Sequence, residues 1–206
     1  MAELTLSNDL RVGAIGRTGS GKSFIMKQLL DKQSRVIIVD SKHQVNWPGY
    51  HLTSSPSAAL LEKKVIFRPE GRITDAFWED VMDVLHEDGG GILYIDELAE
   101  VCTANTMPAG LRSIFRMGRE LGVGCYWAAQ SATEITNTAI RQSDVLILFL
   151  NLGASDRDKL IKTCGDIGEV TAHLGLREFV VFESANQAYD SNDIHAYTYN
   201  PEMAVH

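Results

Sequence analysis

The chain has 206 residues, of which 45% are hydrophobic and 22% charged, and a net charge of −8, the composition of one soluble globular domain. The acidic balance argues against a protein that coats nucleic acid over its whole surface, although it allows a narrow basic contact surface. No run approaches the ~20 apolar residues that span a bilayer, and the first residues do not form a secretion signal. The three cysteines lack paired spacing, which suits a reducing cytoplasm and predicts buried or semi-buried thiols, so we expect a cytoplasmic protein.

Short apolar runs alternate with amphipathic segments, a pattern that predicts a mainly parallel central sheet flanked by helices. In chain order we expect strand Arg11–Ile15, helix Lys22–Lys32, strands Arg35–Val39 and Val65–Arg68, helix Thr74–His86, strand Ile92–Ile95, helix Ala109–Leu121, strand Gly124–Ala129, helix Glu134–Arg141, strand Val145–Leu150, helix Ser155–Lys162 and strands Glu178–Glu183 and Ile194–Tyr199. We expect loops at Asn46–Pro56 and Gly89–Gly91 and a tail over residues 200–206. The expected fold is a single three-layer α/β domain over residues 1–206.

A glycine-rich segment follows the first strand and matches the pattern GxxxxGK[ST] at every fixed position. Its glycines let backbone N–H groups turn inward around an anion, and the helix that opens at Lys22 adds the positive end of its dipole. We expect Lys22 to reach the β and γ phosphates of a nucleotide and Ser23 to bind Mg²⁺ through its hydroxyl. The predicted nucleotide-binding residues are Gly16, Arg17, Thr18, Gly19, Ser20, Gly21, Lys22 and Ser23.

Polar residues end two of the predicted strands. Ile92–Ile95 delivers Asp96 to the edge of the sheet, where Mg²⁺ needs an acidic partner, and Glu97 can then polarise the water that attacks the γ phosphate. A carboxylate in this second position is typical of P-loop ATPases that activate water. The guanine-reading motif Asn-Lys-x-Asp is absent, so we expect ATP. Gln130, after the strand Gly124–Ala129, either senses the γ phosphate or begins a turn.

Several arginines are candidates for contacts in trans. Arg112, Arg116 and Arg119 are spaced to share one face of the helix predicted over Ala109–Leu121. That basic stripe is a solvated helix face, a contact to DNA phosphates, or the source of an arginine finger for a neighbouring subunit. The pattern does not rank the finger candidates, which are Arg17, Arg112, Arg116, Arg119 and Arg141.

Tryptophans divide into core and loop positions. Trp78, on the helix Thr74–His86, and Trp127, within a buried strand, are expected to lie in the core. Trp47 and Tyr50 fall in a predicted loop, where they either pack within the loop or contact a partner.

The order of these motifs resembles the FtsK–HerA superfamily of ring-forming DNA pumps over roughly residues 10–150. The family usually has threonine before the glutamine, where this chain has Ala129. The compact size is similar to the genome-packaging ATPases of tailless viruses with an internal membrane. The segments that carry the resemblance are Gly16–Ser23, Val39-Asp40-Ser41-Lys42, Tyr94-Ile95-Asp96-Glu97, Arg119-Glu120-Leu121-Gly122-Val123 and Ala129-Gln130-Ser131.

The resemblance implies a RecA/ASCE-like P-loop NTPase fold, with ATP and Mg²⁺ bound, and a homo-oligomeric ring, expected to be a hexamer, with double-stranded DNA in its channel. It implies packaging of a viral genome into a preformed capsid in the host cytoplasm, with a capsid or membrane-vertex protein as docking partner. By the same resemblance Lys22 is the phosphate clamp, and Ser23 and Asp96 are the Mg²⁺ ligands. Glu97 activates the water, Gln130 is the sensor, and Arg119 acts in trans.

Three other functions remain open from the sequence. A secretion or assembly ATPase usually carries a membrane segment, which the sequence lacks. A P-loop phosphotransferase acting on a nucleotide or small molecule needs a basic lid, for which Ser155–Lys162 is available, but it leaves Glu97 unexplained. A module that holds ATP without hydrolysing it is disfavoured by the intact Lys22, Asp96 and Glu97.

Overall fold

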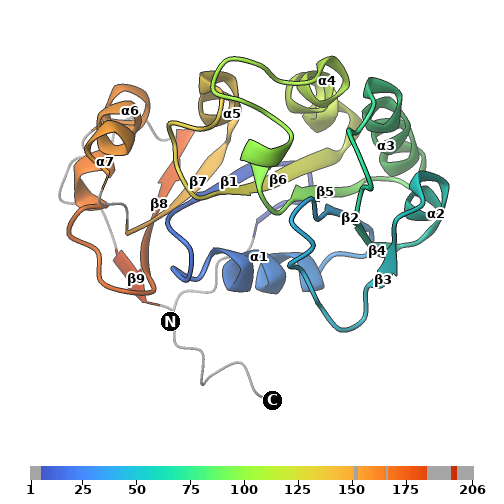
Figure 1. Ribbon diagram of the computed structural model, residues 1–206, viewed down its shortest axis with the longest axis horizontal. Coiled ribbons are helices and arrows are strands. Elements are labelled where there is room, and N and C mark those ends of the chain that lie inside the picture. The colour runs from blue at the N-terminus through green and yellow to red at the C-terminus, as the bar shows by residue number, and fades with distance from the viewer. Residues whose placement is uncertain (1–5, 151–152, 166, 185–195, 199–206) are drawn as a thin grey trace.

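In the part of the chain that the structure describes, a nine-stranded sheet forms the centre of the fold (Figure 1). The computed structural model describes residues 6–150, 153–165, 167–184 and 196–198. The strand order is β3-β4-β2-β5-β6-β1-β7-β8-β9, in which the first seven strands of the chain run parallel and β8 and β9 pair antiparallel. The strands are β1 Arg11–Ile15, β2 Val36–Val39, β3 His51–Thr53, β4 Lys64–Phe67, β5 Gly91–Ile95, β6 Val123–Ala129, β7 Val145–Phe149, β8 Glu178–Glu183 and β9 Ala196–Thr198.

Helices cover both faces of the sheet and complete the three-layer P-loop NTPase fold that the sequence predicts (Figure 1). Among the described helices, α1 packs on one face, whereas α3, α4 and α5 pack on the other. Short 3₁₀ segments follow β5 and α4, at Leu98–Glu100 and Gly118–Leu121. The helices are α1 Lys22–Asp31, α2 Pro56–Leu61, α3 Asp75–Glu87, α4 Ala109–Met117, α5 Asn137–Gln142, α6 Ala154–Cys164 and α7 Ile167–Val170.

The core consists of two apolar layers, one on each side of the sheet. Because side chains alternate along a strand, Val36 and Ile38 of β2 join the cluster around α1, and Ile37 and Val39 join the cluster around α3 and α4. All four side chains are fully buried. Burial on both faces explains why these strands appear in the sequence as continuous apolar runs.

Most of the predicted elements are confirmed. The seven strands predicted between Arg11 and Glu183 match β1, β2 and β4–β8 to within one residue at each end. β9 lies inside the edge strand predicted over Ile194–Tyr199, whose flanking residues fall outside the described ranges, as does the predicted tail at 200–206.

The prediction of a continuous loop over Asn46–Pro56 is wrong. His51–Thr53 form β3, a short parallel strand beside β4 at the edge of the sheet, and α2 begins at Pro56. Ser55 caps α2 by accepting a hydrogen bond from the Ala58 N–H, and proline suits the first helical position because no N–H is needed there. The capping residues were a detectable signal, but the pairing of a three-residue strand was not.

The prediction of one continuous helix over Ala109–Leu121 is also wrong. α4 ends at Met117, and the next turn tightens into the 3₁₀ segment. A Cβ atom at Gly118 would lie 2.6 Å from the Val123 carbonyl oxygen, because the chain turns back here into β6. Gly122, with φ 73°, completes the turn. Arg119 therefore leaves the helical face that Arg112 and Arg116 share.

Buried side chains agree with several further expectations. Trp78 and Trp127 are fully buried, and the thiols of the three free cysteines are buried as well. Trp47 stacks on Tyr94 of β5 with 5.8 Å between ring centroids and meets its loop neighbour Tyr50 edge-on at 5.7 Å, so both loop aromatics pack against the protein itself. Within the described ranges, no helix has both the length and the apolar character that crossing a membrane requires.

Candidate active site

The candidate site lies at the carboxyl ends of β2, β5, β6 and β1, which are neighbours in the sheet. The loops that follow these strands meet at one edge, the place where open α/β sheets bind ligands. A pocket of about 290 Å³ opens there. Its lining residues are Thr18, Gly19, Gly21, Lys22, Ser23, Phe24, Lys42, Gln44, Asp96, Glu97, Gln130 and Arg177.

The glycine-rich loop Gly16–Ser23 joins β1 to α1. Gly19 and Gly21 have φ values of 79° and 110°, a backbone conformation that residues with a Cβ atom rarely adopt. These turns bring the start of α1, at Lys22, to the wall of the pocket. Backbone N–H groups and the positive end of a helix dipole thus meet in one place, as an anion site requires.

Lys22 is a buried cation within this loop, with only 8% of its surface exposed. Its ammonium donates to the carbonyl oxygens of Gly16 and Arg17, the latter at 3.1 Å. Burial lowers the pKa of Lys22 below its ordinary value, an effect that the negative charges of Glu97 and Asp96 oppose. The charges of these two acids therefore act on Lys22 across the pocket, while its hydrogen bonds go to the loop itself.

Asp96 follows β5 directly and is partly buried. Tyr94 donates a hydrogen bond from its hydroxyl to Asp96 Oδ1 at 2.8 Å. Burial raises the pKa of Asp96; the Tyr94 hydrogen bond and the charge of Lys22 oppose this rise, whereas the charges of Asp40 and Glu97 add to it. A cation bound beside the Asp96 carboxylate would stabilise its charged form and so oppose the rise in its pKa.

Glu97 is buried, with 6% of its surface exposed, and both carboxylate oxygens are engaged. Oε1 accepts the backbone N–H of Gln130 at 3.2 Å, and Oε2 accepts from the Lys42 ammonium at 3.1 Å. The Gln130 side chain turns to the phosphate loop instead, where its Oε1 accepts a hydrogen bond from the Thr18 hydroxyl at 3.0 Å. Gln130 thus connects the phosphate loop to Glu97 through these two hydrogen bonds, and its role as a sensor stays a prediction.

Lys42 and Gln44 line the pocket but were not predicted as site residues. They belong to a turn after β2 that Asp40 organises: its buried carboxylate accepts the N–H groups of Gln44 at 2.9 Å and Val45 at 3.0 Å. Arg68 ties the same turn down, with Nε 2.9 Å from Asp40 Oδ2. The polar residues after β2 were visible in the sequence, but not their approach to Glu97, which depends on the pairing of β2 with β5.

Arg177 also lines the pocket and, like Phe24, was not predicted as a site residue. It precedes β8 and has φ 69°, a value unusual for a residue other than glycine. Strained conformations of this kind gather at functional sites. No local sequence signal marks the residue, because β8 reaches the phosphate loop only through its pairing with β7.

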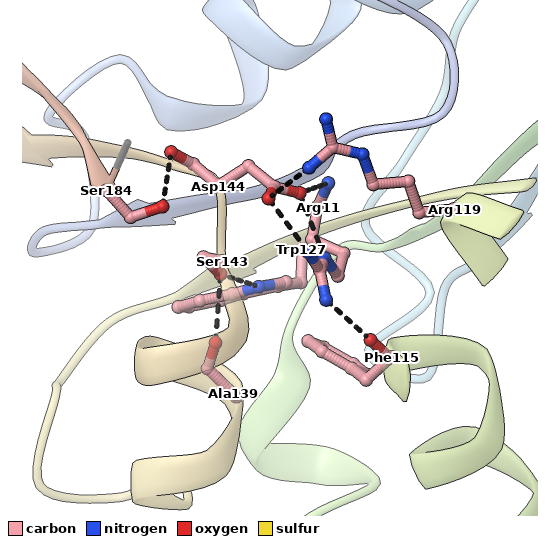
Figure 2. Close-up of polar contacts among 8 residues, drawn as sticks. All are labelled: Arg11, Phe115, Arg119, Trp127, Ala139, Ser143, Asp144 and Ser184. Atoms are coloured by element: carbon pink, nitrogen blue, oxygen red, sulfur yellow. Dashed lines mark hydrogen bonds and ion pairs between the residues drawn. The ribbon is translucent and has the colours of Figure 1, made fainter. Parts of the chain in front are cut away.

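Arg119 lies away from this pocket. Figure 2 shows its guanidinium directed at Asp144, with Nη1 3.4 Å from Oδ1 and 56% of the side chain exposed. Arg11 makes the main contact with Asp144, through Nε at 2.9 Å and Nη2 at 2.8 Å, and also donates to the Phe115 carbonyl oxygen. Arg11 begins β1 and Asp144 precedes β7, so this cluster marks the amino ends of the strands. The site is at their carboxyl ends, roughly 15 Å away for a five-residue strand.

The remaining finger candidates are exposed. Arg17 lies in the phosphate loop, Arg112 and Arg116 on α4, and Arg141 at the end of α5. Of these, Arg112 donates to the Met107 carbonyl oxygen at 3.2 Å.

The donor set of the pocket suits Mg²⁺. The Ser23 hydroxyl and the Asp96 carboxylate supply oxygen ligands, which this ion prefers, and both line the pocket. Among the described residues, no group of three or more histidine, cysteine, aspartate or glutamate side chains could hold a metal ion by itself. A site with few protein ligands is the kind in which Mg²⁺ takes its other ligands from phosphate and water.

The fold and the site together define a P-loop NTPase domain of the RecA/ASCE type. β6 lies between the strand that precedes the phosphate loop and the strand that leads to the acids, and Glu97 follows Asp96, the predicted Mg²⁺ ligand. No model of a known protein family matches the chain.

Individual proteins are nevertheless similar. Protein P9 of Pseudoalteromonas phage PM2 is 28% identical over 136 residues, which span 62% of this chain and 62% of that relative. The structure of the genome packaging NTPase B204 from Sulfolobus turreted icosahedral virus 2, in complex with ATP-γS, has a TM-score of 0.80 at 19% identity and covers 95% of this chain and 100% of its own. VirB4 of Thermoanaerobacter pseudethanolicus has a TM-score of 0.66 at 12% identity, covering 93% and 90%. At these identities the solved structures confirm the predicted fold.

Proposed function

We propose that this protein is an ATP-hydrolysing motor that translocates double-stranded DNA and packages a viral genome into a preformed capsid. The observation that carries the proposal is the meeting of Lys22, Asp96, Glu97 and Gln130 in one pocket. The similarity to an NTPase of viral genome packaging over 95% of the chain supports the choice of substrate.

In this proposal the residues of the pocket divide the chemistry of hydrolysis among them. The loop N–H groups and Lys22 bind the β and γ phosphates, and Ser23 and Asp96 would hold a Mg²⁺ ion, which would neutralise phosphate charge. Glu97 accepts a proton from a water molecule as the water oxygen bonds to the γ phosphorus. The bond between that phosphorus and the bridging oxygen breaks, and ADP and phosphate leave.

We further propose that the active form is a homo-oligomeric ring, a hexamer, with DNA in its channel. Arg119 acts in trans in this arrangement. Its exposed guanidinium at the amino ends of the strands is too far from the pocket of its own chain, but it is available to a neighbour in a head-to-tail contact. The ring would work in the host cytoplasm and dock on a capsid or membrane-vertex protein.

The phosphotransferase alternative finds less support. Its basic lid would come from α6, where Lys159 donates to the Ile135 carbonyl oxygen and Arg157 lies 3.9 Å from Glu169. Cations engaged in this way are poorly suited to closing over a substrate. The alternative would be revived by transfer of phosphate from ATP to a nucleoside monophosphate.

The test is the rate of phosphate release with and without double-stranded DNA, measured together with the mass in solution. We expect DNA to stimulate hydrolysis by an assembled ring. Lys22→Ala and Glu97→Gln should each lower turnover by a factor on the order of 10² or more. The proposal would be contradicted by a stable monomer that hydrolyses ATP at the same rate with and without DNA.

A further inference from the structure

Lys42 places a second lysine in the pocket that contains Lys22, and the chemistry described above gives it no task. Its ammonium lies 3.1 Å from Glu97 Oε2 and 3.6 Å from Glu100 Oε1. The side chain of Lys42 is 26% exposed and that of Glu97 only 6% exposed. Water screens the buried Glu97 carboxylate poorly, whereas the Lys42 side chain is partly open to solvent.

The charge on Lys42 is maintained by these acids. Burial by itself lowers the pKa of the ammonium, but the hydrogen bond and the charge of Glu97, together with Glu100, outweigh burial and raise it. Lys42 therefore stays protonated at neutral pH and brings a permanent cation to the pocket.

Hydrogen bonds hold the backbone of the turn that carries Lys42, and the lysine side chain is partly exposed. The turn after β2 is tied to the Asp40 carboxylate through the N–H groups of Gln44 and Val45. A lysine on such a turn can redirect its four-carbon side chain without moving the chain, and its ammonium has three donors. The Lys42 ammonium can therefore change its partner while the backbone of the turn stays in place.

We propose that Lys42 binds the γ-phosphate of ATP and thereby controls Glu97. The γ-phosphate oxygens compete with the Glu97 carboxylate for the same ammonium. A triphosphate draws Lys42 away, which leaves Glu97 free to take the proton of the attacking water. A diphosphate lacks the competing group and leaves the Lys42–Glu97 pair in place. This inference rests on the proposed ATPase function and adds to it a residue that distinguishes ATP from ADP.

The experiment compares the dissociation constants of ATPγS and ADP, by calorimetry in the presence of Mg²⁺, for the wild-type protein and three variants. Lys42→Met removes the charge and keeps the length, Lys42→Arg keeps a cation, and Lys27→Met is the matched control, since Lys27 pairs with Asp31 on the exposed face of α1. For Lys42→Met we expect the affinity for ATPγS to fall about tenfold or more, with the affinity for ADP unchanged. Lys42→Arg should retain most of the preference, and Lys27→Met all of it.

The outcomes separate this inference from the proposed function. Wild-type protein that binds neither nucleotide would refute the ATPase proposal itself. Wild-type protein that binds both, together with a Lys42→Met variant of unchanged ATPγS-to-ADP preference, would overturn only the role of Lys42 and make its pair with Glu97 purely structural. A melting temperature for each variant identifies misfolding, and if Lys42→Met does not fold, Lys42→Gln takes its place in the same comparison.

Discussion

The indole of Trp127 fills the space that a side chain at Gly13 would need: a Cβ atom there would lie 2.2 Å from Trp127 Cζ2. The two residues face each other across the paired strands β1 and β6. The buried indole N–H donates to Ser143 Oγ at 3.1 Å, and the Ser143 hydroxyl donates to the Ala139 carbonyl oxygen at 2.9 Å (Figure 2). Glycine at position 13 is thus a packing requirement of the strand that leads to the phosphate loop.

We expect Gly13→Ala to lower the free energy of unfolding by about 1–3 kcal/mol, because the methyl group must displace a close-packed ring. Chemical denaturation measures this loss. Gly71→Ala is the control, since no heavy atom lies within 4 Å of a Cβ at that position, and it should change stability little. Trp127→Phe in the Gly13→Ala background should recover part of the loss; strictly additive effects would show that the ring is not the obstacle.

Asp96→Asn should stabilise the folded protein while removing its Mg²⁺-dependent turnover. The folded-state pKa of Asp96 is raised above the unfolded value, chiefly by burial, so the stability associated with its proton is lost as pH rises through the folded pKa. The asparagine amide stays neutral at every pH, so the variant does not lose this stability. We expect its melting temperature to be higher than that of the wild type at neutral pH, and the difference to shrink as the pH falls. A variant that is less stable at every pH would contradict this account.

Asp144→Asn should have the opposite dependence on pH. Burial raises the pKa of Asp144, but the hydrogen bonds and charge of Arg11, with Arg119, outweigh it and hold the pKa below its ordinary value. The stability from this carboxylate is therefore present above the unfolded pKa and lost as pH falls through the folded pKa. We expect a cost of about 2 kcal/mol at neutral pH that fades in acid, measured by denaturant titration. Asp83→Asn, on the exposed side of α3, serves as control.

Arg119→Ala should leave folding and ATP binding intact and lower turnover by a factor on the order of 10³, as expected for a finger acting in trans. Its contact with Asp144 is long, and Arg11 holds that carboxylate without it. Mixing Arg119→Ala subunits with Lys22→Ala subunits should restore some activity, since a neighbour supplies what each lacks. Full activity in Arg119→Ala would mean that another exposed arginine is the finger. Arg116→Ala is then the next variant to test.

Arg177→Ala should weaken nucleotide binding by about tenfold, because an exposed guanidinium is lost from the pocket wall. Fluorescence titration with a labelled ATP analogue measures the change. The control is Arg72→Ala, an exposed arginine that lines a different pocket. Equal affinities in the two variants would mean that the unusual backbone at Arg177 serves the turn before β8 rather than the nucleotide.

Much of the fold was predictable from short-range patterns. The buried parallel strands appear as continuous apolar runs because both faces of the sheet are covered, and their ends were found to within one residue. The errors came from long-range contacts. β3 exists only through its pairing with β4, and the helix begun at Ala109 tightens at Gly118 because the Val123 carbonyl oxygen lies against it.

The candidate site divides along the same line. By itself the sequence determined the phosphate loop and the adjacent acids Asp96 and Glu97, because a contiguous motif carries its own local geometry: a glycine turn, a helix start, the end of a strand. Only the tertiary structure decided that Lys42 contacts Glu97, that Arg177 reaches the pocket and that Arg119 lies at the far end of the strands. These relationships depend on which strands are neighbours, and strand order is set by packing between residues distant in the chain.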